Sequence, residues 1–142
     1  MEKINCVLLV DDRPTTNFFN KKIISLCGNV EHVKETKNGK EALNYILKQG
    51  AYAQKNIPKP NIILLDVNMP VMDGFEFVEK IGECDKEITQ ETLIVLLTTS
   101  NWSRDKNKAL KEELIHDFLE KPLTKEKFNK IADYYKTTYA KE

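Results

Sequence analysis

The sequence has few of the residues on which disulfide frameworks and zinc sites depend. Its 142 residues include three cysteines, Cys6, Cys27 and Cys84, an odd number without the spacing of metal ligands. Small buried thiols in a reducing compartment account for such a set better than disulfides do. Only two histidines are present, and neither His32 nor His116 has a catalytic partner by spacing. The sequence therefore favours neither thiolate–metal chemistry nor histidine-based catalysis.

Long hydrophobic runs and an excess of charge of one sign are also missing. No apolar run approaches the length that crosses a bilayer, and the N-terminal stretch is too short for the core of a signal peptide. Lys plus Arg and Asp plus Glu both number 22, so the net charge is zero. Charge balance thus gives no reason to expect binding to nucleic acid or to an anionic membrane. We expect a cytoplasmic protein with neither of these partners.

Short apolar runs alternate with helical patterns along the chain. Unbroken runs of Val, Ile and Leu predict strands at residues 4–10, 62–65 and 93–97. Weaker apolar stretches predict two more strands at residues 30–36 and 115–119. Apolar residues three and four positions apart predict helices at residues 14–26, 39–49, about 75–81, about 109–110, and from Thr124 onward. Strand followed by helix, repeated in this way, is typical of an open parallel sheet with helices on both faces.

The predicted architecture is therefore a doubly wound α/β fold with a five-stranded parallel sheet. The proline-containing segment 51–60 is a long loop inside this unit and does not divide it. We expect a single domain over residues 1–142, without an output domain.

Polar side chains follow four of the predicted strands where each strand ends. Asp11 and Asp12 follow the first strand, and Asp66 ends the third. Thr98 ends the fourth and Lys121 follows the fifth. The carboxyl ends of parallel strands share one edge of the sheet, which is where ligands bind in open α/β folds. We expect these five side chains to meet there.

This combination of groups suits phosphoryl transfer. Crowded carboxylates repel one another unless a cation joins them, and oxygen ligands of this kind suit Mg²⁺. A carboxylate can act as a nucleophile and form an acyl phosphate. An ammonium and a hydroxyl group can stabilise the phosphoryl oxygens during the transfer. The sequence therefore predicts a Mg²⁺-dependent phosphoryl-transfer site, although Asp11 and Asp12 taken alone would also fit a helix cap.

Four short motifs resemble those of the response-regulator receiver family. They are VDD at 10–12, DVNMPVMDG at 66–74, LT at 97–98 and EKP at 120–122. The resemblance extends from about Ile4 to the final helix and so covers essentially the whole chain. It implies a flavodoxin-like fold with strand order 2-1-3-4-5.

The resemblance also implies a chemical role for each site residue. Asp66 would accept a phosphoryl group from a sensor histidine kinase or a histidine phosphotransfer protein. Asp11, Asp12 and Asp66 would bind Mg²⁺ together with the backbone carbonyl of Asn68. Lys121 would pair with the phosphoryl group, and its bond to the following proline would be cis.

A switch in protein contacts would follow phosphorylation. Thr98 would move toward the phosphoryl group and the aromatic Phe118 would turn inward behind it. A downstream protein, or a second copy of the chain, would then bind the face formed by the fourth helix, the fifth strand and the fifth helix. The chain would catalyse only its own phosphorylation and dephosphorylation, and would not otherwise be an enzyme.

Two other functions are compatible with the same fold. A Mg²⁺-dependent aspartyl phosphatase would have a D-x-D-x-T motif after a strand. Here Asn68 stands two residues after Asp66, in the place of the second aspartate, which is the general acid. A scaffold that never takes a phosphoryl group would not need the complete set of site residues. Both remain alternatives to the receiver function.

Overall fold

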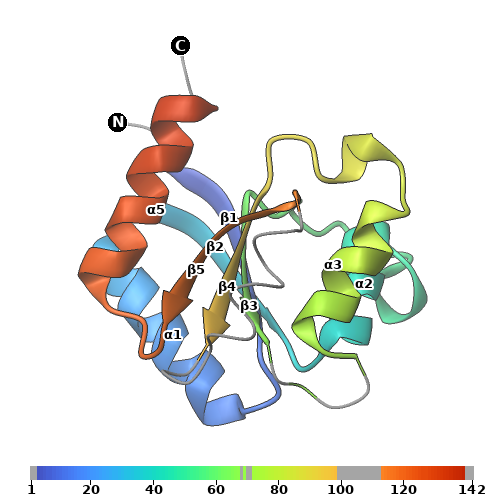
Figure 1. The fold of residues 1–142 in the computed structure, drawn as a ribbon, viewed down its shortest axis with the longest axis horizontal. Helices are drawn as coiled ribbons and strands as arrows, with labels where there is room; N and C mark the ends of the chain where they lie inside the picture. Colours follow the sequence, from blue (N-terminus) through green and yellow to red (C-terminus); the bar gives the residue numbers. More distant parts are fainter. Residues whose placement is uncertain (1–2, 68, 70–71, 99–112, 140–142) are drawn as a thin grey trace.

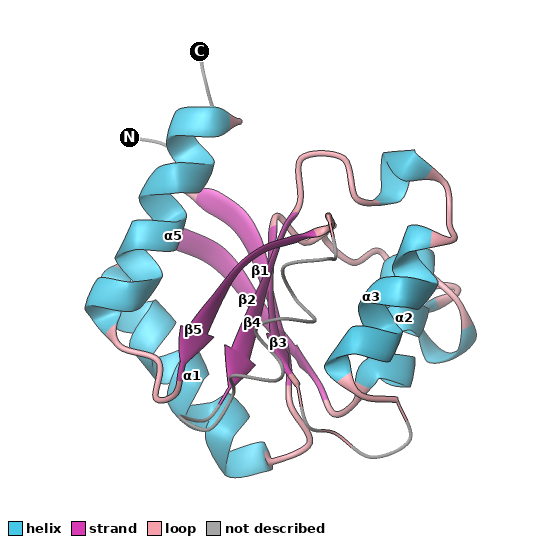
Figure 2. Ribbon diagram, in the orientation of Figure 1, coloured by secondary structure: helices cyan, strands magenta, loops and turns pink. Residues whose placement is uncertain are grey.

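The computed structural model describes residues 3–67, 69, 72–98 and 113–139, which form one parallel sheet flanked by helices (Figures 1 and 2). The five strands lie in the order β2-β1-β3-β4-β5, as the sequence predicts. Their bounds are β1 Ile4–Val10, β2 Val30–Thr36, β3 Ile62–Asp66, β4 Leu93–Thr98 and β5 Ile115–Glu120.

The helices cover both faces of the sheet. On one face lie α1 (Pro14–Cys27) and α5 (Lys125–Thr138), and on the other lie α2 (Gly39–Leu47) and α3 (Gly74–Gly82) (Figure 1). Short 3-10 turns stand at Gly50–Tyr52 and Lys86–Ile88. The helix predicted around residues 109–110 falls outside the described residues. Within the described part of the chain, every helix is too short or too polar to cross a membrane.

The three central strands are apolar on both faces because each face supports its own core. In β1, Val7 and Leu9 belong to the cluster under α1 and α5, whereas Leu8 and Val10 belong to the cluster under α2 and α3. Neighbours along a strand point to opposite faces. A strand between two helical layers therefore needs an unbroken apolar run, which is the pattern that predicts β1, β3 and β4.

The two strands with weaker patterns form the edges of the sheet. Much of β2 and β5 is exposed, and Thr36 is the one residue of β2 that is fully buried. Edge strands pack on one neighbour only, so fewer of their positions need to be apolar. Their weak signal in the sequence therefore reflects their place in the sheet.

Helix α1 buries only some of its apolar residues, and its buried face also includes polar ones. Phe18 and Phe19 are 68% and 52% exposed, whereas Asn17, Asn20 and Ile24 are buried. Both asparagines lie on the buried face of the helix, and Asn17 donates to the carbonyl of Asp11, just after β1. Spacing alone predicts the helix correctly, but it does not predict which side faces the core.

The cysteines are unpaired thiols, as expected. Cys6 is buried in β1, with its sulfur 3.9 Å from the hydroxyl of Tyr45, and burial raises the pKa of its thiol to about 11. Cys27 and Cys84 are half-buried on the helical layers. A thiol with so high a pKa is a poor nucleophile, so Cys6 acts as a packing residue.

Replacing Gly74 with alanine is expected to destabilise the fold at the very end of β3. A Cβ atom at Gly74 would lie 2.7 Å from the carbonyl oxygen of Asp66 and 3.1 Å from the Cα of Val67. Both are backbone atoms, one in the last residue of β3 and one in the residue after it, and they cannot move aside as a flexible side chain would. We expect Gly74→Ala to lower the free energy of unfolding by about 2–3 kcal/mol, measured by urea denaturation.

Gly82→Ala is the matched control for this change. Gly82 ends the same helix, and among the described residues a Cβ there would meet a single side-chain atom, Cδ1 of Leu114, at 3.3 Å. We expect this variant to stay within about 0.5 kcal/mol of the wild type. Equal stability of the two variants would contradict the close-approach argument for Gly74.

Candidate functional site

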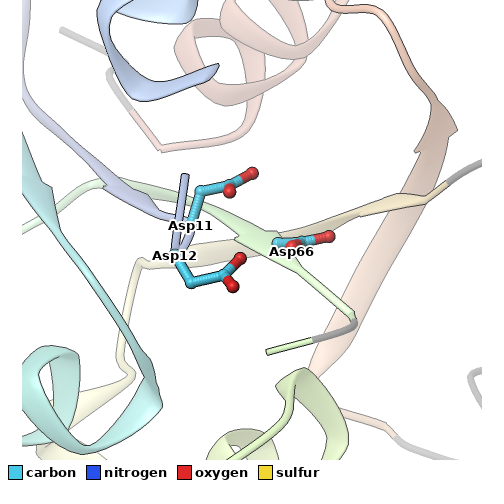
Figure 3. Close-up of side chains that lie close together, drawn as sticks. All are labelled: Asp11, Asp12 and Asp66. Carbon is cyan, nitrogen blue, oxygen red and sulfur yellow. The ribbon is translucent and has the colours of Figure 1, made fainter. Parts of the chain in front are cut away.

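Three aspartates meet at the carboxyl edge of the sheet (Figure 3). Asp11 and Asp12 lie between β1 and α1, and Asp66 is the last residue of β3. Each offers one carboxylate oxygen, and these three oxygens lie within 4.8 Å of one another. Asp11 and Asp66 are buried and Asp12 is half-buried. The cluster is therefore crowded and largely shielded from water.

The register of the sheet brings these residues together. β1 and β3 are parallel neighbours in which Val10 pairs with Leu65, so the two strands end at the same level. Two hydrogen bonds hold the loop after β1. The backbone N–H of Asp11 donates to the carbonyl of Thr36 (3.2 Å), and the backbone N–H of Arg13 donates to the side-chain oxygen Oδ1 of Asp11 (2.9 Å). Both strand pairing and loop contacts thus fix the carboxylates.

Lys121 supplies the positive charge at this site. Its Nζ lies 3.0 Å from Oδ1 of Asp66 and 3.4 Å from Oδ2 of Asp11. Its backbone N–H donates to the carbonyl of Thr98 at 2.7 Å, which ties the loop after β5 to the end of β4. Within the described part of the chain, one ammonium and three carboxylates give this cluster a formal charge of −2, which favours binding of a divalent cation.

The carboxylates of this site fit a small divalent cation. Oδ1 of Asp12 is buried, and it finds no hydrogen-bond partner among the residues that the structure describes. A buried carboxylate oxygen without a donor is costly unless a cation contacts it. With oxygen ligands alone, a hard cation such as Mg²⁺ is the natural occupant.

The remaining predicted residues lie around this centre. Thr98 is buried at the end of β4, and its carbonyl accepts the hydrogen bond from Lys121. Phe118 is half-buried in β5 and packs against the core cluster under α2 and α3. Asn68 lies outside the described residues. The peptide bond between Lys121 and Pro122 is cis, as the resemblance implies.

One residue near the site has no counterpart in the motifs. The Nδ2 group of Asn17 in α1 donates to the carbonyls of Asp11 (3.1 Å) and Thr36 (3.3 Å), and so joins the ends of β1 and β2. Asparagine is a poor residue for a helix interior unless its side chain has a specific partner. That mismatch is the only signal in the sequence that could have identified Asn17.

Comparison with known proteins places the chain among signalling proteins. Residues 7–133 match the family model described as the response regulator receiver domain. The chain is 32% identical over 126 residues to the two-component response regulator ARR22 of Arabidopsis thaliana, covering 89% of this chain and 80% of that protein. It is 37% identical over 133 residues to hybrid signal transduction histidine kinase B of Dictyostelium discoideum, covering 86% of this chain.

The chain spans only part of some of these relatives. It corresponds to 6% of the Dictyostelium kinase, and to 43% of the nitrate/nitrite response regulator NarL of Escherichia coli, with which it shares 34% identity over 105 residues. The absence of an output domain therefore stays a prediction.

Solved structures agree with the fold described above. A two-component response regulator from Cytophaga hutchinsonii superposes with a TM-score of 0.83 at 29% identity, covering 96% of this chain and 99% of that one. The chemotaxis protein CheY4 of Vibrio cholerae superposes with a TM-score of 0.73 at 27% identity, covering 93% and 98%. The flavodoxin-like fold predicted from the sequence is confirmed.

Proposed function

The chain belongs to the response regulator receiver family of two-component signalling, and from this premise we propose that it is switched by transfer of a phosphoryl group to Asp66. The observation that carries the proposal is the contact between Lys121 and Asp66 within the aspartate cluster. In this contact, the ammonium of Lys121 lies 3.0 Å from an oxygen of Asp66, the residue that would act as the nucleophile. A purely structural ion pair would not need two further carboxylates beside it.

The proposed transfer step is a displacement at phosphorus. An oxygen of Asp66 attacks the phosphorus of a phosphohistidine, the P–N bond breaks, and the leaving imidazole keeps the electron pair and takes up a proton. The product on Asp66 is an acyl phosphate. Lys121 stabilises the added negative charge, and the hydroxyl of Thr98 donates a hydrogen bond to a phosphoryl oxygen.

Asp11, Asp12 and Asp66 would hold Mg²⁺, with the backbone carbonyl of Asn68 as a further ligand. Mg²⁺ at this place supplies positive charge that neutralises the phosphoryl oxygens. The buried oxygen of Asp12, which has no hydrogen-bond partner in the described part of the chain, and the net charge of the cluster support this assignment. Before the metal binds, the protein's own contribution is to hold the three carboxylates together, against their mutual repulsion, by strand pairing.

The phosphodonor would be a sensor histidine kinase or a histidine phosphotransfer protein. A hollow of about 240 Å³ opens beside Lys121, between Thr15, Thr16 and Phe19 of α1 and the loop after β5. A donor side chain that reaches Asp66 would pass close to this hollow. The product of signalling would be a changed contact on the face that includes β5 and α5, with a downstream protein or with a second copy of the chain.

Intact-mass measurement with a small phosphodonor tests this function. We expect the wild type incubated with acetyl phosphate and Mg²⁺ to gain one phosphoryl mass, and to gain none in EDTA. Because an acyl phosphate reacts with hydroxylamine, the gain should disappear on hydroxylamine treatment, and peptide mapping should place it on Asp66. A folded protein that binds Mg²⁺ but gains no mass would indicate a phosphate-independent scaffold instead.

A further inference from the structure

A second lysine holds the loop that carries Lys121. The Nζ of Lys127, in the first turn of α5, donates to the carbonyl of Glu120 at 2.6 Å and to the carbonyl of Pro122 at 3.0 Å. These two carbonyls belong to the residues immediately before and after Lys121. One ammonium therefore bridges the backbone across the residue that contacts Asp66.

The position of Lys127 in α5 does not explain its presence. The helix is capped by Thr124, whose hydroxyl accepts from the backbone N–H of Lys127 at 3.1 Å. The positive end of the helix dipole lies in this turn, so a cation here is disfavoured by the helix itself. The compensating contacts are the two loop carbonyls, toward which the ammonium turns.

The backbone of Lys121 is thus anchored on both sides. Its own N–H donates to the carbonyl of Thr98 at 2.7 Å, which fixes it to β4. The bridge from Lys127 fixes the flanking carbonyls to α5. With the backbone held at three points, the long side chain of Lys121 needs to adopt few conformations to place its Nζ between Asp66 and Asp11.

We propose that Lys127 is a positioning residue that holds Lys121 against the aspartate cluster. The inference rests on the proposed function only for its effect on phosphoryl transfer; the effect on Lys121 itself is independent of it. Without the bridge, the carbonyls of Glu120 and Pro122 lose their tie to α5, and the contact of Lys121 with Asp66 is lost for part of the time. Phosphoryl transfer depends on the positions of the reacting groups, and a displacement of about 1 Å is enough to slow it.

The test compares three variants with the wild type. Lys127→Met removes the ammonium but keeps the apolar stem, and Lys127→Arg restores a donor that can reach two carbonyls. Lys130→Met is the matched control, because Lys130 lies on the same helix and is exposed. The first readout is the rate at which acetic anhydride acylates Lys121, followed by peptide mapping. The second is the rate of phosphoryl uptake on Asp66, and melting temperature is recorded for each variant.

In Lys127→Met, we expect acetic anhydride to acylate Lys121 about threefold to tenfold faster than in the wild type. We expect phosphoryl uptake on Asp66 to be about tenfold slower, as follows from the loss of a charge-assisted hydrogen bond. Lys127→Arg should lie near the wild type, and Lys130→Met should equal it. The proposal is overturned if Lys127→Met is folded and its Lys121 is acylated at the wild-type rate, even if the melting temperature of the variant falls. If the wild type takes up no phosphoryl group, the proposed function fails, while the acylation rates still decide the role of Lys127.

Discussion

An Asp66→Asn variant is expected to take up no phosphoryl group under conditions in which the wild type is fully modified. The amide of asparagine has almost the shape of the carboxylate but no anionic oxygen to attack phosphorus. Asp66 is buried at the end of β3. Because the amide fills the same space as the carboxylate, the change should leave the strand and its pairing with β4 intact. Intact mass after incubation with acetyl phosphate and Mg²⁺ measures the effect.

Asp133→Asn provides the control for this loss. Asp133 is an exposed residue of α5, and the same amide replacement there should leave phosphoryl uptake at the wild-type level. Modification of Asp66→Asn at a neighbouring aspartate, found by peptide mapping, would contradict the assignment of the acceptor to Asp66. It would show instead that any carboxylate of the cluster can act as the nucleophile.

An Asp12→Asn variant is expected to bind Mg²⁺ much more weakly and yet to be more stable without metal. The variant removes one of three carboxylates whose oxygens lie within 4.8 Å of one another, and it removes the charge from a buried oxygen without a described hydrogen-bond partner. Relief of this repulsion should raise the free energy of unfolding in EDTA by about 1 kcal/mol. Loss of a charged ligand should weaken Mg²⁺ binding by on the order of 100-fold.

Urea denaturation at increasing Mg²⁺ concentration measures both effects in one experiment. The wild type should gain stability with the logarithm of Mg²⁺ concentration once its dissociation constant is exceeded. The Asp12→Asn curve should start higher in EDTA and rise only at far higher Mg²⁺ concentration. Asp133→Asn should follow the wild type. A free energy of unfolding below that of the wild type in EDTA would contradict the claim that repulsion among the three carboxylates destabilises the metal-free protein.

Much of the architecture was accessible from the sequence because the central strands are buried on both faces. The predicted bounds of β1 agree with the structure, and those of β3 and β4 differ by one residue at the end. The helix predicted to run to residue 49 ends earlier, at Leu47, because Lys48 adopts a left-handed conformation with φ 55°. Such an ending depends on local backbone geometry, for which a lysine gives no warning.

The centre of the site was equally accessible, because its members follow strands whose ends share one edge. Asp11, Asp12, Asp66 and Lys121 lie together as predicted. The supporting contacts were not predicted. Asn17 and Lys127 act through side-chain bonds to backbone carbonyls, and any residue type can offer a carbonyl. The sequence can mark Asn17 as unusual within a helix, but it does not show which carbonyls Asn17 and Lys127 contact, so the partners come from the three-dimensional structure.

The ion pair between Lys121 and Asp11 joins residues 110 positions apart in the chain. The residues of β1 are synthesised early. Asp11, which follows β1, gains Lys121 as a neighbour only when β5 has paired with β4. A chain that has not yet received this last strand would carry three mutually repelling carboxylates without the ammonium of Lys121 beside them. If the proposed function holds, uptake of a phosphoryl group on Asp66 depends on completion of the sheet, and a copy that lacks β5 is expected to be silent rather than falsely active.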